Sequence, residues 1–266
     1  MSLLAAIGRR GGEETGMSVV AYTRGAPTFS ERVLDLSDKV DYRQALTDDE
    51  RDAVYRLRYD AYMREGTITP NFGRRLSDKY DDLDNAWIFG VFVDGRLSAS
   101  IRLNISSLST PEIPAMGVFA DILEPIVHSG KTVIDPTRFV VDQSVAKRFP
   151  ELPYLTVRIG WMAGEYFSAD MILATVRAEH QAFYKRIFGH ELLAEPRDYP
   201  SLKKPISMMA LDYHAMKPRV HHRYPFFRST AFERRMLFGG ASTGAVWTSA
   251  TDTEDAAVGD STALVG

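Results

Sequence analysis

The chain has 266 residues, a mass of 29.8 kDa and 45% hydrophobic residues, which suffices for one large globular core or a domain with tails. Its net charge of -3 and pI near 6.1 give no general attraction to nucleic acid, and the absence of cysteine excludes disulfides, thiolate metal sites and a cysteine nucleophile. No apolar run approaches the roughly 20 residues that span a bilayer, and the start lacks a signal-peptide pattern, so we expect a cytoplasmic protein without a transmembrane segment.

The two ends of the chain differ in composition from the middle. Residues 1–38 are rich in Gly, Arg, Glu and Ser without a sustained period, and residues 239–266 consist largely of Gly, Ala, Ser, Thr and acids. Such segments bury too little apolar surface to offset the entropy of ordering. We therefore expect disordered tails at 1–38 and 239–266 around one folded domain at 39–238.

The first half of this domain predicts a strand, a helix and a hairpin. Residues 40–46 form a strand pattern, and Thr47 with Glu50 forms a capping box that opens a helix. The helix ends at Gly66, a residue suited to the C′ position. Two strands then follow, WIFGVFVD and RLSASIRLNI, joined through an Asp-Gly turn at residues 94–95.

The second half alternates helices and strands. A short helix is expected near residues 118–127, before the strand KTVIDPTRFVVDQ. After it come the helix ELPYLTVRIGWMAGEYFSAD, the strand MILATVR, the helix AEHQAFYKRIFG, and the strands HELLAEP and ISMMALDYHAM. This alternation after an initial hairpin predicts a mixed α/β sheet.

The strand KTVIDPTRFVVDQ carries an acid, Asp135, and a base, Arg138, amid apolar residues. A spacing of three places them on opposite faces of an unbroken strand. Pro136 between them donates no ladder hydrogen bond, which favours a bulge that turns both charges toward one pocket. The alternative, a structural ion pair that closes the strand, is equally consistent with the spacing.

Four further charged residues lie on or near apolar elements. Arg58 falls beside the apolar stripe of its helix, so it points at a buried acid or a ligand, or else extends past the core to solvent. Asp78 and Asp81 belong to a polar loop, for which a solvated acidic loop is the default and a calcium site a weak alternative, so no metal site is predicted. Arg102 interrupts the second hairpin strand, where an outward-facing residue is the commoner case.

The order of elements, together with the segment AFYKRIFGH, resembles the GNAT acyltransferase fold. The six charged positions recur in the order seen in acyl-homoserine-lactone (autoinducer) synthases, and residues 40–238 look like the related N-acyl amino acid synthases: Arg58, Asp78, Asp81, Arg102, Asp135 and Arg138. The resemblance implies a GNAT-like, mostly antiparallel mixed sheet and an N-acyltransferase whose six charged residues converge on one pocket. The autoinducer synthases have glutamate where this chain has Asp135, and a tryptophan expected after the first helix is absent from GTITPNFG, which favours an amino-acid acceptor.

The segment after the central strand, VVDQSVAKRFPELPYLTVRI, contains no glycine and two prolines. GNAT enzymes hold the pyrophosphate of coenzyme A on backbone N–H groups of a Gly-rich loop. The resemblance together with the missing loop implies a donor on the phosphopantetheine arm of acyl carrier protein, with no permanently bound cofactor. The basic, aromatic segment 216–238 then supplies the docking surface for that acidic carrier, unless it is a basic surface helix with buried aromatics: Arg223, Arg228, Arg234 and Arg235.

The expected reaction is attack of an amine on an acyl thioester, and the charged residues are candidates for its catalytic and binding roles. Asp135 is the candidate base, with Arg58 and Arg138 as catalytic partners that also oppose a raised pKa of Asp135. Arg102 is expected to clamp the acceptor carboxylate, and Asp78 and Asp81 to bind substrate.

Backbone N–H groups around Phe139, Val140 and Val141 are expected to hold the oxyanion. Tyr184 and His180 are candidates to protonate the leaving thiolate, although a structural role fits each better.

The sequence is also compatible with three other functions. The chain could be an acyl-homoserine-lactone synthase, an acyl-CoA-dependent N-acetyltransferase, or a non-catalytic module that binds an acyl chain or a carrier protein. The scattered apolar side chains define neither the length of the acyl chain nor the acceptor amino acid.

Overall fold

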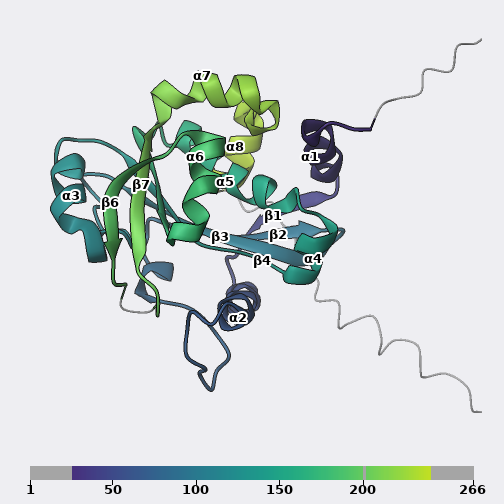
Figure 1. Ribbon diagram of the computed structural model, residues 1–266, viewed down its shortest axis with the longest axis horizontal. Coiled ribbons are helices and arrows are strands. Elements are labelled where there is room, and N and C mark those ends of the chain that lie inside the picture. Colours follow the sequence, from purple (N-terminus) through teal and green to yellow (C-terminus); the bar gives the residue numbers. More distant parts are fainter. Residues whose placement is uncertain (1–25, 200–201, 241–266) are drawn as a thin grey trace, which may run out of the picture.

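The computed structural model describes residues 26–199 and 202–240, and its centre is a seven-stranded sheet (Figure 1). The strand order is β1-β2-β3-β4-β5-β7-β6, and every neighbouring pair is antiparallel except β4 with β5. The predicted mixed, mostly antiparallel α/β sheet is confirmed. The strands are β1 (Val40–Gln44), β2 (Ala86–Val93), β3 (Arg96–Ser106), β4 (Val133–Val141), β5 (Met171–Val176), β6 (Glu191–Arg197) and β7 (Ile206–Asp212).

Helices cover both faces of this sheet (Figure 1). One face carries α2 (Asp48–Arg64) and α3 (Met116–His128). The other face carries the remaining long helices and the main apolar core: α1 (Phe29–Ser37), α5 (Leu152–Tyr166), α6 (Gln181–Phe188), α7 (Tyr213–Arg223) and α8 (Ala231–Phe238). Shorter turns connect them: η1 (Lys79–Asp81), α4 (Gln143–Arg148), η2 (Ala178–His180) and η3 (Pro225–Phe227). No helix in the described ranges is long and apolar enough to cross a membrane.

Strand alternation explains the two cores. Ile134 and Ile172 point into the core beneath α5, whereas their neighbours Val133 and Leu173 point into the smaller core beneath α3. Because both faces of β4 and β5 are covered, these strands are apolar on both sides. Charged side chains in this region therefore need partners within the protein.

The predicted N-terminal boundary at residue 38 is wrong. Residues Phe29–Ser37 form α1, whose capping box pairs the Thr28 hydroxyl with the Glu31 backbone N–H and the Glu31 carboxylate with the Thr28 N–H. Val33 and Leu36 are buried in the main core. The Thr-x-x-Glu signal of this helix lies within a segment whose overall composition is that of a disordered tail. The other tail predictions, for residues 1–25 and 241–266, lie outside the described residues.

Local signals elsewhere are confirmed. Thr47 and Glu50 form the capping box of α2, and Gly66 follows that helix with a φ of 66°. Asp94 and Gly95 turn the β2–β3 hairpin with φ values of 49° and 81°, the left-handed pair that a two-residue hairpin loop requires.

The central strand β4 separates from β5 and also bulges. β4 pairs with β5 only at its first two residues, Val133 and Ile134, and beyond them the strands diverge. Opposite β3, Thr137 pairs with Arg102 and Val140 with Ser100, so two residues of β4 stand against one of β3. The predicted break is confirmed, but it lies at residues 138–139 rather than at the proline, and Arg138 adopts a φ of 51° there. A non-glycine residue holds this conformation only where its surroundings enforce it.

Candidate active site

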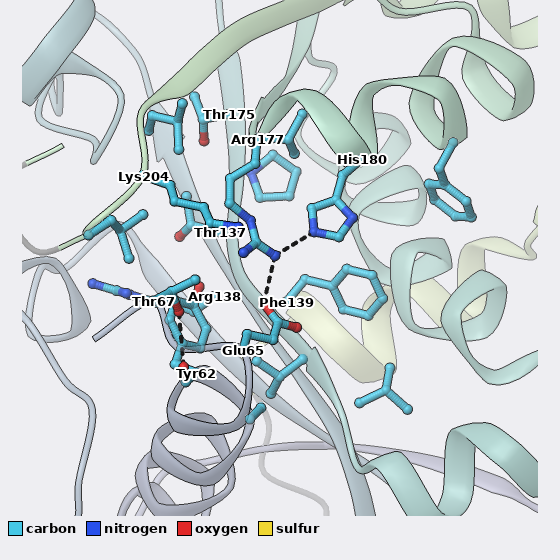
Figure 2. A pocket seen from close by; sticks show the side chains of 18 of the residues that line it. Tyr62, Glu65, Thr67, Thr137, Arg138, Phe139, Thr175, Arg177, His180 and Lys204 are labelled. Atoms are coloured by element: carbon cyan, nitrogen blue, oxygen red, sulfur yellow. Dashed lines mark hydrogen bonds and ion pairs between the residues drawn. The ribbon is translucent and has the colours of Figure 1, made fainter. Parts of the chain in front are cut away.

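A cavity of about 400 Å³ opens where β4 and β5 separate (Figure 2). Its lining includes Tyr62 and Glu65 of α2 from one face of the sheet, and Phe183 and Tyr184 of α6 from the other. The cavity therefore passes through the sheet at the point where the strands diverge. The α2 side of the lining is polar and the α5–α6 side is apolar, so a single space offers two chemically different ends.

The polar end contains cations that the sequence analysis did not single out. Arg177 directly follows β5, and its Nη2 donates to Glu65 Oε2 at 2.6 Å and lies 2.7 Å from His180 Nε2 (Figure 2). Its Nε lies 3.3 Å from a carboxylate oxygen of Glu179, which Lys204 approaches at 3.7 Å.

His180 does not fit the role of general acid. Burial, with Arg177 beside the ring, lowers the pKa of His180, so the ring is neutral. Nε2 then accepts the hydrogen bond from Arg177 and carries no proton to give. Tyr184 lines the cavity, and burial raises the pKa of its phenol, so it stays protonated.

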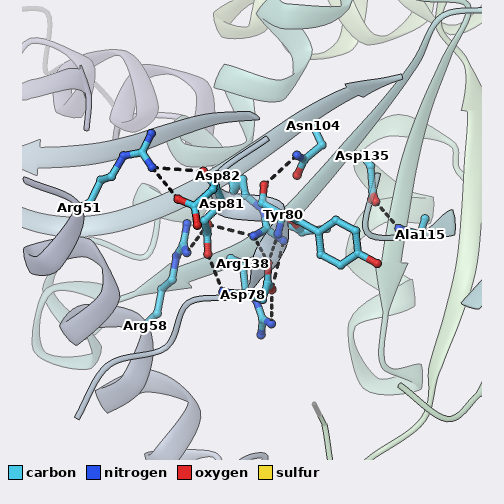
Figure 3. A network of polar contacts seen from close by, with 12 residues as sticks. Arg51, Arg58, Asp78, Tyr80, Asp81, Asp82, Asn104, Ala115, Asp135 and Arg138 are labelled. Carbon is cyan, nitrogen blue, oxygen red and sulfur yellow. Dashed lines mark hydrogen bonds and ion pairs between the residues drawn. The ribbon is translucent and has the colours of Figure 1, made fainter. Parts of the chain in front are cut away.

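Behind the polar end, five of the six predicted charges form one chain of ion pairs, Arg58–Asp81–Arg102–Asp78–Arg138 (Figure 3). The successive N–O distances are 2.8, 2.9, 2.6 and 2.6 Å. Both aspartates belong to the capping box of η1, in which Asp81 Oδ2 accepts from the Asp78 N–H at 2.9 Å. The two carboxylates of the acidic loop therefore bind Arg58, Arg102 and Arg138.

This chain of ion pairs corrects two predicted roles. Arg102 is fully buried, and its guanidinium is bound by Asp78, Asp81 and the Thr137 hydroxyl, so it is not a clamp for the acceptor carboxylate. Arg58 is also fully buried behind Asp81 and does not line the cavity, so it does not reach a reacting group. Neither aspartate is among the cavity-lining residues, and both carboxylates are bound by arginines.

Arg138 does line the cavity, although it is also tied to the ion-pair chain. Its Nε and Nη2 both donate to Asp78 Oδ2, at 3.1 and 2.6 Å, and its guanidinium lies over the ring of Tyr62 at 5.5 Å. Although burial opposes it, the charge of Arg102 and Arg138 lowers the pKa of Asp78 to about 2, so the pair stays ionised. These contacts hold the bulge of β4 in its unusual backbone conformation.

Asp135 stands apart from the arginines (Figure 3). It is fully buried, its Oδ2 accepts from the Ala115 N–H at 2.8 Å, and its Oδ1 lies 3.4 Å from the Thr175 hydroxyl. The prediction that all six charges converge on one pocket is therefore wrong. Of the six, Arg138 is the one that lines the cavity, and the bulge turns it toward Asp78 and away from Asp135. Asp135 is not among the cavity-lining residues, but its hydrogen-bond partner Thr175 is.

The arginines do not prevent a raised pKa of Asp135. Burial dominates and raises the pKa of Asp135 to about 6, although the Ala115 N–H and the charge of Arg102 act in the opposite direction. A carboxylate with this pKa is largely ionised at pH 7, yet it is a far better proton acceptor than an exposed aspartate.

The oxyanion candidates Phe139, Val140 and Val141 lie on the cavity wall, beyond the last pairing of β4 with β5. The backbone edge that faces β5 is therefore not covered by that strand.

The four predicted docking arginines lie on and between α7 and α8, away from the cavity lining. Arg223, Arg228 and Arg235 are exposed, whereas Arg234 donates from Nη1 to the Ser229 carbonyl and hydroxyl. The aromatic residues of this segment include three that are buried in the core: Phe226, Phe227 and Phe238. The exposed arginines of this segment thus lie over buried aromatic side chains.

Sequence reasoning missed Glu65, Thr175, Arg177 and Lys204. A signal existed for Arg177, since a charge at the end of the apolar strand MILATVR marks the edge of a sheet. Lys204 lies in a loop and is brought to the cavity only by the fold. Among the described residues, no group of three or more His, Asp or Glu is arranged to hold a metal ion.

A GNAT-like sheet that is split between its parallel strands, with a cavity through the split, defines the acyltransferase class. The chain belongs to the family of the N-acyl amino acid synthase FeeM, whose model matches residues 53–212. It is therefore an acyltransferase of the N-acyl amino acid synthase type.

Two solved structures show the shared fold. FeeM, an N-acyl amino acid synthase from uncultured soil microbes, gives a TM-score of 0.57 at 18% identity, over 69% of this chain and 97% of its own. TofI, in a ternary complex with an inhibitor and MTA, gives a TM-score of 0.53 at 13% identity, over 71% of this chain and 100% of its own. No curated protein matches the sequence.

Proposed function

We propose that this enzyme transfers a long-chain acyl group from the phosphopantetheine arm of acyl carrier protein to the α-amine of an amino acid. The amine nitrogen bonds to the thioester carbonyl carbon, the carbon–sulfur bond breaks, and the products are an N-acyl amino acid and the free thiol. The observation that supports this proposal is that the cavity beside the β4 bulge has both an apolar end and a polar end.

The apolar end fits an acyl chain. Its walls come from β4, α5 and α6, and include Phe139, Val141, Pro153 and Phe183. Each methylene buried against such a wall contributes about 0.8 kcal/mol. Long chains are therefore favoured over an acetyl group, which leaves most of this end empty.

The polar end fits the acceptor. An α-amino group has a pKa near 8, so it must lose a proton to attack at neutral pH. We assign that proton to Asp135, received through the Thr175 hydroxyl, which gives its own proton to Asp135 Oδ1 as it takes one from the amine. A general base of this kind contributes about 10²–10⁴ in rate.

The oxyanion that forms at the thioester carbonyl requires hydrogen-bond donors already in place. We assign this role to backbone N–H groups near Phe139 and Val141, on the edge of β4 that β5 leaves uncovered. Arg138 acts as a positioning residue in this scheme, since its two hydrogen bonds to Asp78 hold the bulge that presents those groups.

The segment after β4 supports a carrier-bound donor over coenzyme A. Asp142 caps α4, and its carboxylate already accepts from the N–H groups of Ser144 and Val145, at 2.8 and 3.2 Å. A pyrophosphate that approached these groups would meet a negative charge in its place. A phosphopantetheine arm lacks this pyrophosphate, and the exposed Arg223, Arg228 and Arg235 offer a surface for the acidic carrier.

The test compares acyl carrier protein and coenzyme A as donors of the same acyl group to a panel of amino acids, with products identified by mass spectrometry. We expect N-acyl amino acids from the carrier-bound donor. If only acyl-CoA gives product, acyl carrier protein is not the donor. If neither donor gives product, the protein is a non-catalytic binding module.

A paired variant tests the docking surface. Charge reversal at Arg228 and Arg235 should raise the KM for acyl carrier protein, more strongly at low salt, while the KM for the amino acid stays unchanged. The same reversal at Arg186, an exposed arginine on α6, serves as the control. Equal effects of both changes would contradict a dedicated docking surface.

A further inference from the structure

The arginines on and behind the cavity wall differ in how exposed their counterions are. Arg102 and Arg138 are paired with Asp78 and Asp81, whose side chains are only 18% and 1% exposed. Removal of such a buried partner leaves an uncompensated charge in the interior. These two arginines therefore keep their aspartates and do not exchange them for a substrate.

Arg177 has the opposite arrangement. Its own side chain is 13% exposed, but its counterions Glu65 and Glu179 are 45% and 49% exposed. Half-exposed carboxylates leave an ion pair at low cost, because water solvates them as they turn outward. Arg177 is thus a nearly buried cation on the cavity wall whose present partners are replaceable.

The position of Arg177 matches the acceptor and not the acyl chain. It pairs with Glu65 of α2, so it lies on the polar side of the cavity. Thr175, the proposed proton relay to Asp135, stands two residues earlier, roughly 7 Å along an extended strand. In an α-amino acid the nitrogen and the carboxylate carbon are separated by one carbon, about 2.5 Å across. The long arginine side chain can cover the rest of the distance between Arg177 and an amine held at Thr175.

We propose that Arg177 binds the α-carboxylate of the acceptor amino acid, which displaces Glu65 and Glu179 from the guanidinium. Lys204, also on the cavity wall, adds a second positive charge to this subsite. His180 orients the guanidinium through its neutral Nε2 and is a positioning residue. This inference rests on the proposed function, since it names how that reaction holds its acceptor.

The test measures KM separately for acceptor and donor in Arg177→Met and Arg177→Lys. We expect Arg177→Met to raise the acceptor KM at least tenfold and to leave the donor KM within twofold. Arg177→Lys keeps the charge and loses the planar fork, so its acceptor KM should lie between those of wild type and Arg177→Met. It also serves if the methionine variant does not fold.

Two further measurements separate this role from a structural one. Glu65→Gln removes the competing carboxylate and should lower the acceptor KM, which a purely structural ion pair does not predict. Wild type should strongly prefer an amino acid over the corresponding amine without a carboxylate, and Arg177→Met should lose that preference.

The outcomes also distinguish the possible errors. A raised donor KM in Arg177→Met with an unchanged acceptor KM would assign the residue to the donor phosphate and overturn the proposal. An unchanged preference for the carboxylate would overturn it as well. Failure of the wild-type enzyme to acylate any amino acid would instead refute the proposed function itself.

Discussion

Replacement of Asp135 by asparagine tests the assignment of Asp135 as the general base. If that assignment is right, the substitution lowers activity and raises stability at neutral pH. Asparagine has nearly the same shape, and its side-chain amide still accepts from the Ala115 N–H and donates to the Thr175 hydroxyl. The substitution therefore keeps both contacts and removes the charge and the basicity. We expect turnover to fall at least tenfold, and by as much as about 10²–10⁴.

The stability change follows from the pKa of Asp135, which burial raises from 3.8 to about 6. A raised pKa means that the folded state binds the proton more tightly than the unfolded chain. The resulting stabilisation is fully present below pH 3.8 and is lost as the pH rises through 6. Over this whole window the loss is about 3 kcal/mol, of which about 1 kcal/mol falls between pH 5 and pH 7.

The free energy of unfolding should therefore be compared for Asp135→Asn and wild type at pH 5 and pH 7 by urea denaturation. We expect the variant to gain about 1 kcal/mol relative to wild type over that interval. Burial lowers the pKa of His190 to about 4, so His190 also changes stability with pH, but the difference between the two proteins cancels that contribution.

The pH profile of kcat/KM gives a second measurement. The wild-type profile should fall below pH 6, because protonation of Asp135 removes the base, and this limb should vanish in Asp135→Asn. Asp142→Asn is a matched control, since Asp142 caps α4 outside the cavity and its pKa is lowered, not raised. Full activity in Asp135→Asn, or a difference in stability that does not change with pH, would refute the reasoning.

Two further substitutions test the framework of the site. Asp81→Asn leaves the buried guanidinium of Arg58 without a carboxylate, which should cost about 3–5 kcal/mol of unfolding free energy. Gly164→Ala places a Cβ only 2.6 Å from the ring of Tyr213, which is 1% exposed, so overpacking should cost about 1–3 kcal/mol and lower the Tm.

Each of these has a matched control. Asp82 forms an exposed ion pair with Arg51, so Asp82→Asn should change stability by less than about 1 kcal/mol. The Cβ added by Gly160→Ala meets its nearest atom at 3.5 Å, and alanine favours a helix, so this change should be neutral or stabilising. Equal losses in target and control would contradict the packing and charge arguments.

The sequence by itself determined the local elements of this protein and their order. The capping box at Thr47, the Asp-Gly turn at 94–95 and the apolar strand around Ile134 each depend on residues within a few positions of one another. Such signals are complete in a short window, so helices, hairpin and mixed sheet were all predictable. The helix at Phe29–Ser37 carries the same kind of capping signal, but it lies in a stretch whose composition is typical of a disordered tail.

Only the tertiary structure decided which charge meets which. Asp78 pairs with Arg102 and Arg138, which lie 24 and 60 positions away, and no spacing rule encodes those contacts. A buried charge takes the partner that the fold brings within reach, and the bulge in β4 turned Arg138 from Asp135 toward Asp78. The same fold buries Asp135, which raises its pKa. It also places Arg177 on the cavity wall, where its counterions Glu65 and Glu179 are half exposed to water.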